Sequence, residues 1–246
     1  SNAADAGAAI HVSNSSRAVL ARCLFTRNRC QALGRHHDGL LLRGAVATQD
    51  SASAVFDDCH FTANVCPRGR GSGVSHWASG VLTFKASTFS RNADSAVDAT
   101  HAGQVTFDGC AFTANNASGA AASLADTAAV FLGTVFTDNF AVSSPMLPGS
   151  GGCLSLLSGA SATLTNVRAV RNRAAQGGFA ALNGVKGVLT IGQCCLSSVS
   201  SHSIIAPFLQ SEGGFRTTRQ RRSAAALSRS LQPTTSDFSL RFHHEF

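Results

Sequence analysis

Residues 84–92 read Phe-Lys-Ala-Ser-Thr-Phe-Ser-Arg-Asn, and this stretch decides the fold because its pattern recurs along the chain. A bulky apolar residue is followed three positions later by a small residue, two positions later by Phe, and three positions later by Asn. The same spacing is found at residues 20–28, 56–64, 107–115 and 131–139. It returns without the Phe at residues 164–172, and without both Phe and Asn at residues 191–199. Such a repeat predicts a solenoid of stacked units.

The length of the repeat unit varies, because successive copies are separated by 23 to 36 residues. A β-helix accepts such variation, since one turn of a coil can bulge outward while the strands still stack. Apolar and polar residues alternate around Phe84 as in a strand, and no stretch of about 12 residues has the period of a helix. We therefore predict an all-β, single-stranded, right-handed parallel β-helix of about seven coils over residues 1–204. This solenoid would lack terminal caps, so its open edges favour edge-to-edge self-association.

Stacking would place equivalent residues of successive coils in columns with a spacing of about 4.8 Å. The predicted aromatic column consists of Phe25, Phe61, Phe89, Phe112 and Phe136. Burial of each of these rings would contribute roughly 1.5–3 kcal/mol. The predicted amide column consists of Asn28, Asn64, Asn92, Asn115, Asn139 and Asn172. Asn tolerates the left-handed backbone region at turns, and stacked Asn side chains can also bond to one another.

Two short motifs connect this repeat to a known family. Phe-x-x-Asn is complete in five copies, and Gly-rich strand starts such as Gly7-Ala8-Ala9-Ile10 and Gly151-Gly152-Cys153-Leu154 lie between them. Together these motifs resemble the Phe-x-x-Asn and Gly-Gly-Ala-Ile repeats of the chlamydial polymorphic outer-membrane proteins, over roughly residues 1–200. The resemblance implies a surface-exposed β-helix used in adhesion or structural interaction. It also implies an extracellular or cell-surface location, with glycans or other surface proteins as partners.

Eight cysteines raise the question of metal or disulfide chemistry. Four of them share one inward column, where Ser87 and Thr134 occupy the same position in other coils, as expected of a small packing residue. No Cys-x-x-Cys pair provides the spacing of a zinc site, so we expect no metal and no cofactor. The pairs Cys23–Cys59 and Cys30–Cys66 would lie on neighbouring coils, and either pair could form a disulfide.

Some parallel β-helices cleave polysaccharides, so the outward carboxylates are candidate catalytic groups. Asp57 and Asp108 share one outward register with Lys85 between them, Asp58 follows Asp57, and Asp50 precedes the strand. Such carboxylates beside a base could bind Ca²⁺ and abstract a proton, as in a polysaccharide lyase or glycoside hydrolase of the pectate-lyase-like class. The alternative is a solvated charge ladder, in which opposite charges stack across neighbouring strands. We favour the charge ladder, and therefore a protein without a catalytic site.

Trp77 is the single tryptophan, and it is expected in a loop between two coils. An exposed indole could stack on a sugar ring, because aromatic rings combine an apolar face with a polar edge. The alternative is that Trp77 covers the side of the stack.

Charge and hydropathy limit the remaining partners. The net charge is +7, and residues 205–246 contribute six Arg against three acidic residues. We interpret this basic segment as a disordered tail and not as a nucleic-acid site. No apolar run approaches 18 residues, so no transmembrane segment is expected.

Overall fold

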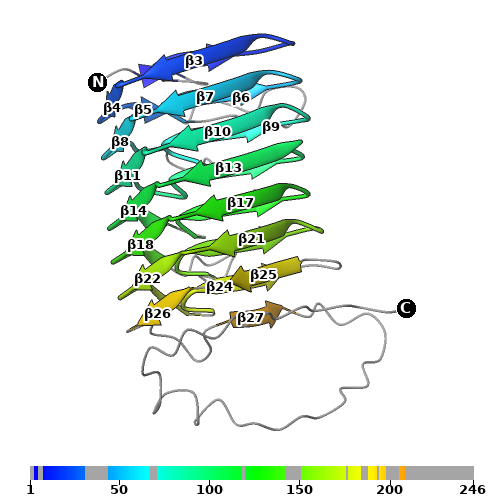
Figure 1. Cartoon of the computed structure of the whole chain (residues 1–246). Coiled ribbons are helices and arrows are strands. Elements are labelled where there is room, and N and C mark those ends of the chain that lie inside the picture. The colour runs from blue at the N-terminus through cyan, green and yellow to red at the C-terminus, as the bar shows by residue number, and fades with distance from the viewer. Residues whose placement is uncertain are drawn as a thin grey trace, which may run out of the picture.

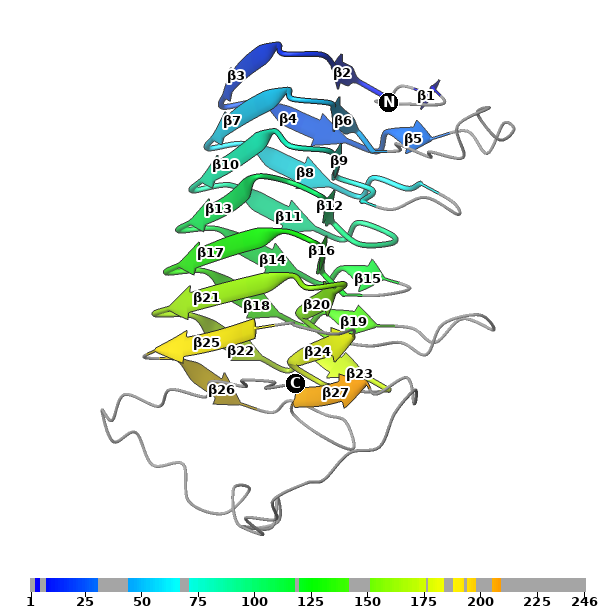
Figure 2. The ribbon, with the colours of Figure 1, turned by 90° about the vertical axis from the view of Figure 1, so that its right-hand side faces the viewer.

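The computed structural model is a stack of parallel strands that winds around one axis (Figures 1 and 2). It describes residues 3–4, 8–30, 44–66, 71–117, 120–141, 151–175, 177–183, 188–192, 194–197 and 205–208. All regular elements within these ranges are strands, and neighbouring coils pair in parallel. The prediction of an all-β parallel β-helix is confirmed.

Three sheets run along the stack. The β3–β25 sheet consists of β3 (Arg17–Ala21), β7 (Ser53–Asp57), β10 (Val81–Lys85), β13 (Gln104–Asp108), β17 (Ala128–Leu132), β21 (Ser161–Thr165) and β25 (Val188–Gly192). The β4–β26 sheet consists of β4 (Leu24–Thr26), β8 (His60–Thr62), β11 (Thr88–Ser90), β14 (Ala111–Thr113), β18 (Val135–Thr137), β22 (Arg168–Val170) and β26 (Cys195–Ser197). The β2–β27 sheet consists of β2 (Ile10–Val12), β6 (Val46–Gln49), β9 (Val74–Trp77), β12 (Val97–Thr100), β16 (Ala122–Ala125), β20 (Leu154–Leu157), β24 (Ala180–Asn183) and β27 (Ile205–Phe208).

Each coil contributes one strand to each sheet in turn, and seven coils are complete in this sense. A fourth, shorter ladder lies at the corner that follows the β4–β26 sheet (Figure 2). Its strands are β1 (Ala3–Ala4), β5 (Arg29–Cys30), β15 (Asn116–Ala117), β19 (Phe140–Ala141) and β23 (Arg173–Ala174). Isolated bridges through Val65 and Ala93 link β5 to β15, so this ladder continues through the intervening coils.

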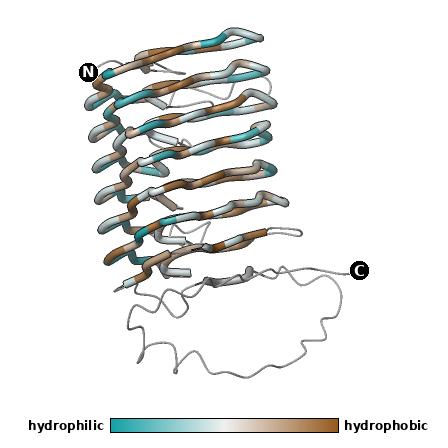
Figure 3. The backbone as a smooth tube through the Cα atoms, viewed as in Figure 1, coloured by the Kyte–Doolittle hydropathy of each residue, from teal (hydrophilic) through white to brown (hydrophobic). Residues whose placement is uncertain are grey.

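Phenylalanine fills the core in two parallel columns. Rings of the predicted column stack at centroid distances of 4.6 to 4.9 Å, from Phe25 to Phe136. A second stacked column contains Phe56, Phe84, Phe107 and Phe131. Phe84 meets Phe89 edge to face at 5.4 Å, which joins the columns. Hydrophobic stretches therefore recur at matching places in successive coils (Figure 3).

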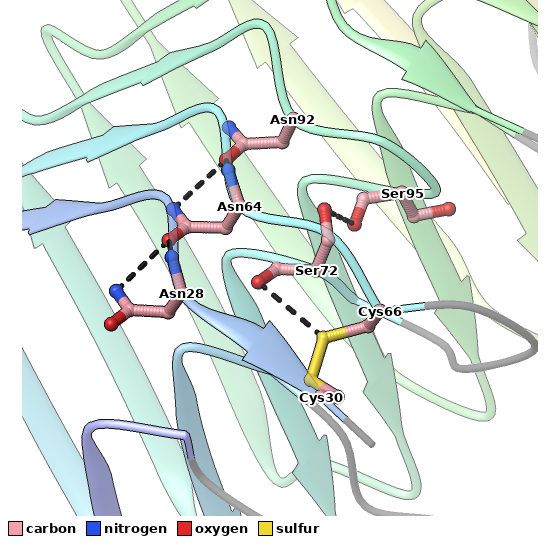
Figure 4. Close-up of a disulfide and its surroundings, with 7 residues drawn as sticks. All are labelled: Asn28, Cys30, Asn64, Cys66, Ser72, Asn92 and Ser95. Atoms are coloured by element: carbon pink, nitrogen blue, oxygen red, sulfur yellow. Dashed lines mark hydrogen bonds between the residues drawn. A yellow bond between two sulfur atoms is a disulfide. The ribbon is translucent and has the colours of Figure 1, made fainter. Parts of the chain in front are cut away.

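The asparagine column forms a continuous buried hydrogen-bond ladder. In each step, Nδ2 of one Asn donates to Oδ1 of the Asn one coil further on, over 2.9 to 3.1 Å from Asn28 to Asn172. Its backbone N–H donates to the same oxygen. From Asn64 onward, Nδ2 also donates to a carbonyl of the preceding coil, as in Asn92 to Phe61 at 2.9 Å. The first steps of the ladder are visible in Figure 4.

The left-handed backbone at this corner is not on asparagine, which corrects one expectation from the sequence. Positive φ values fall on the preceding residue in each coil, as at Arg91 (φ 54°) and Arg171 (φ 53°). The turn therefore does not use the tolerance of Asn for this conformation. The amide is required because it satisfies a backbone N–H and a backbone carbonyl of the preceding coil, as Asn92 does for Asn64 and Phe61, while it donates to the Asn side chain of the next coil.

Cys30 and Cys66 form a disulfide between the first and second coils, with their Cα atoms 4.6 Å apart (Figure 4). The other candidate pair, Cys23 and Cys59, consists of free thiols. In the inward column, Cys110 and Thr134 alike place their sulfur or hydroxyl near the carbonyl two residues earlier. These contacts explain why Cys, Ser and Thr replace one another there.

Strand β27 pairs in parallel with β24, so the β2–β27 sheet includes residues 205–208. Residues 209–246, the remainder of the predicted tail, lie outside the described residues.

Candidate functional site

The outward carboxylates lie where the repeat places them, on the exposed face of the β3–β25 sheet. Lys85 is the register partner of Asp57 in one neighbouring strand and of Asp108 in the other. All three residues are exposed. No ion pair within 4 Å joins Lys85 to either aspartate in the described part of the chain. They form an open column of alternating charge across three neighbouring strands of this sheet, β7, β10 and β13.

Of the other two acidic candidates, Asp58 adjoins this column, since its backbone N–H donates to the carbonyl of Lys85 at 3.0 Å, whereas Asp50 lies apart from it. Asp58 is at the left-handed corner after β7, with Oδ1 3.7 Å from Nε2 of His60. Asp50 is at the opposite end of β7, where its carboxylate accepts hydrogen bonds from the backbone of Asn14 and from the side chain of Gln49. The structure therefore brings Asp57, Lys85 and Asp108 together and separates Asp50 from them.

This arrangement favours a charge ladder over an acid–base site. A general base needs a position within hydrogen-bond reach of a bound substrate, and cleavage uses groups that converge on one bond. Here the side chains project from a flat sheet at successive coils. Among the described residues, no three His, Cys, Asp or Glu side chains form a group that could hold a metal ion.

Trp77 lies in a second polar region of the surface, at the edge of the β2–β27 sheet where its strands end. It is the last residue of β9, so its expected position in a loop is wrong. Val74, Ser75 and His76 are buried, and Trp77 is partly exposed. Because side chains alternate along a strand, Trp77 points to the face opposite that of the inward Val74 and His76. The neighbours of Trp77 in the adjacent coils are Gln49 and Thr100.

The side chains of His101 and Asp126 extend this surface along the stack. The rings of Trp77 and His101 meet edge to face, with centroids 5.0 Å apart and planes at 87°. Nδ1 of His101 lies 3.5 Å from Oδ2 of Asp126 in the next coil. Both side chains are about half exposed, at 50% and 44%. We call Trp77, His101 and Asp126 the tryptophan corner.

A sharp turn positions the tryptophan corner. The residue after the strand has positive φ in five successive coils, at Asp50, Ala78, His101, Asp126 and Ser158. This conformation turns the chain from the β2–β27 sheet toward the β3–β25 sheet. The side chain of the residue therefore lies at the corner between these two sheets. The column is polar except at Ala78, whose small side chain lies immediately after Trp77.

A buried histidine lies behind this corner. Oγ1 of Thr48 is 2.7 Å from Nδ1 of His76, and Nε2 of His76 is 2.5 Å from the carbonyl oxygen of Ala78. Because a carbonyl can only accept, Nε2 carries the proton and Thr48 donates to Nδ1. Burial lowers the pKa of His76, and its contact with Ala78 opposes this effect. The neutral ring thus fixes the turn that follows Trp77.

The sequence reading did not identify His76, His101 or Asp126. His101 and Asp126 each follow a strand at the position of Asp50, so an alignment of the corners would have placed them in one column. No sequence signal identifies His76. It occupies the inward position that Ala99 has in the next coil, and it belongs to no recognisable motif.

The comparison with protein families agrees with this geometry. The model described as "Right handed beta helix region" matches residues 1–127, just over half of the 246-residue chain. The chain belongs to the right-handed β-helix family. No curated protein and no solved structure matches it.

The strand order agrees with membership of the right-handed β-helix family, since the chain passes the β2–β27, β3–β25 and β4–β26 sheets in turn in each complete coil. In a right-handed β-helix the outward residues of successive coils form rows, which explains both the charge ladder and the tryptophan corner. The part of the chain that the structure describes contains no helix long and apolar enough to cross a membrane.

Proposed function

We propose that this right-handed β-helix is a non-catalytic module that works outside the cell or at its surface, where it holds glycans or other surface proteins against its sides. The observation that carries the proposal is the dispersal of the outward carboxylates. Asp57, Lys85 and Asp108 alternate in charge along one face, and Asp50 and Asp58 lie at different corners. The side of the stack offers long rows of binding groups without a converging acid–base pair.

The location is supported by two independent features. The repeated Phe-x-x-Asn motif resembles that of the chlamydial polymorphic outer-membrane proteins, which are surface proteins. The Cys30–Cys66 disulfide suits an oxidising compartment, because structural disulfides are rare where thiols are kept reduced.

The alternative function is a polysaccharide lyase or glycoside hydrolase that uses Asp57, Asp58, Asp108 and Lys85. It is favoured only by the register that brings Asp57, Lys85 and Asp108 side by side. Acidic polysaccharides and Ca²⁺ would be its substrate and cofactor.

The test incubates the folded protein with acidic and neutral polysaccharides in the presence of Ca²⁺. Binding is measured by retention on the immobilised polysaccharide, and cleavage by the release of reducing or unsaturated ends. We expect retention without release. Release that disappears in both Asp57→Asn and Asp108→Asn would contradict the proposal and establish the enzyme. Asp138→Asn is the matched control, because Asp138 is also exposed but lies at a corner on another side.

A further inference from the structure

Among the residues whose side chains the structure describes, two aromatic ones, Phe140 and Trp77, keep exposed surface on the outside of the stack. Phe140 is 46% exposed, and its register neighbours are Asn116 and Arg173. Trp77 also has polar register neighbours, Gln49 and Thr100, and its ring in addition meets the ring of His101 edge to face. We propose that the tryptophan corner is a binding subsite for a neutral sugar. This inference rests on the proposed binding function and names the ligand class and the residues.

The indole supplies the apolar part of the subsite. Trp77 stands at the end of β9, points away from the core, and keeps part of its surface open to solvent. The ring is held in place by its perpendicular contact with His101 at 5.0 Å. An aromatic face carries partial negative charge and attracts C–H groups, which a pyranose ring presents on one side.

The polar part comes from the neighbouring coils. Gln49 lies one coil before Trp77, His101 one coil after it, and Asp126 one coil further. The carboxylate of Asp126 accepts hydrogen bonds, the amide of Gln49 donates and accepts, and the imidazole of His101 does both. The three intervals between these four coils, at about 4.8 Å each, give the groups a span of about 14 Å along the axis. This span suits a short oligosaccharide that lies parallel to the stack.

Ala78 leaves room for the ligand. It occupies the corner position that carries Asp50 in the preceding coil and His101 in the following coil. Its methyl group is smaller than the polar side chains on either side in this column, so it obstructs the approach of a sugar ring to the indole less than they would.

Charge decides the class of sugar. The corner column contains the carboxylates of Asp50 and Asp126 and no Lys or Arg among its described members. A uronic acid bound at Trp77 would place a third carboxylate close to those of Asp50 and Asp126, and neighbouring negative charges repel one another. The tryptophan corner therefore selects uncharged sugars, in contrast to the acidic polymers that the lyase alternative requires.

The experiment uses Trp77 as its own reporter, because the chain contains one tryptophan. Cellohexaose, xylohexaose, mannohexaose and chitohexaose are titrated into the full chain while tryptophan emission is recorded. We expect at least one of them to give a saturable shift of the emission to shorter wavelength, as water leaves the indole. Hexagalacturonate at the same concentrations should give none.

Variants then locate the site by calorimetry with the hexasaccharide that binds. Trp77→Ala and Asp126→Asn should each weaken binding by about tenfold or more. Trp77→Phe, which keeps an aromatic face, should retain part of the affinity. Phe140→Ala is the matched control and should bind as the wild type does. Circular dichroism confirms that each variant keeps its β-structure.

Three outcomes would overturn the inference: no neutral hexasaccharide binds, hexagalacturonate binds equally well, or Trp77→Ala binds with unchanged affinity. The last outcome leaves the proposed binding function in place and moves the sugar to another face. Release of new sugar ends would instead contradict the proposed function, whatever Trp77 does.

Discussion

Asn92 donates two hydrogen bonds to a single oxygen of Asn115, which lies one coil further on. The backbone N and the Nδ2 of Asn92 both donate to Oδ1 of Asn115, at 3.0 and 3.1 Å. Nδ2 of Asn115 in turn donates to the carbonyl of Phe89 at 2.9 Å. Both the oxygen and the nitrogen of the buried Asn115 side chain are therefore hydrogen-bonded. The ladder links each coil to both neighbours through backbone as well as side chains.

Asn115→Ala should lower the free energy of unfolding by about 3 kcal/mol, because two donors of Asn92 and the carbonyl of Phe89 lose a buried partner. Urea denaturation followed by circular dichroism measures the change. Asn116→Ala is the matched control, since Asn116 is the next residue and is exposed. Equal effects of the two substitutions would show that the ladder does not stabilise the fold.

The position of a phenylalanine in its column should determine how much its removal costs. Phe89 is stacked between Phe61 and Phe112 and has no exposed surface, so Phe89→Ala should cost about 3–5 kcal/mol. Phe25 lies in the first coil with Phe61 as its stacking partner, and Phe25→Ala should cost clearly less. The urea midpoints of the two variants compare them directly. A larger loss for Phe25→Ala would contradict the stacked-core account.

Acid should destabilise the protein through His76. Burial holds its pKa below the ordinary value of 6.5, so the unfolded chain binds a proton more readily than the folded chain. The contribution of the neutral ring is complete above pH 6.5 and is lost as the pH falls below that value. The melting temperature should therefore drop between pH 7.5 and pH 5, and the drop should be smaller in His76→Gln. Parallel pH profiles of the two proteins would show that His76 is not responsible.

The disulfide should stabilise the first coil against unfolding. Cys30 and Cys66 are separated by 36 positions in the sequence, and closing a loop of this length stabilises by roughly 3–4 kcal/mol. A reducing agent should lower the melting temperature of the wild type and leave the double variant Cys30→Ala, Cys66→Ala unchanged. Cys23→Ala, which removes a free thiol of the same coil, should respond to the reducing agent as the wild type does. A wild type indifferent to reduction would argue against a stabilising bridge.

Periodicity made the inside of the solenoid readable from the sequence. Residues 84–92 and their copies set the inward columns, because a repeat that stacks must place equivalent residues above one another. The ring centroids of Phe61 and Phe89 are 4.9 Å apart, close to the predicted spacing of about 4.8 Å between neighbouring strands. The Lys85 register between Asp57 and Asp108 follows from the same logic.

The nine-residue repeat alone did not place the corner residues, although Asp50, Ala78 and His101 each lie six positions before the first Phe of their copies. Trp77, His101 and Asp126 lie 24 and 25 positions apart in the sequence, and they become neighbours only once strands β9, β12 and β16 are in register. The choice between the two cysteine pairs also required the structure, since both pairs have the same separation.

The sequence by itself determined the all-β solenoid, its inward columns and the outward charge ladder, because these depend on local alternation and on the period of the repeat. The tertiary structure decided where the left-handed corners fall, that the Asn92 amide satisfies the backbone of the preceding coil, and that the tryptophan corner exists. These features depend on the distance between coils and on the direction of each turn, and neither quantity is encoded in the spacing of residues along the chain.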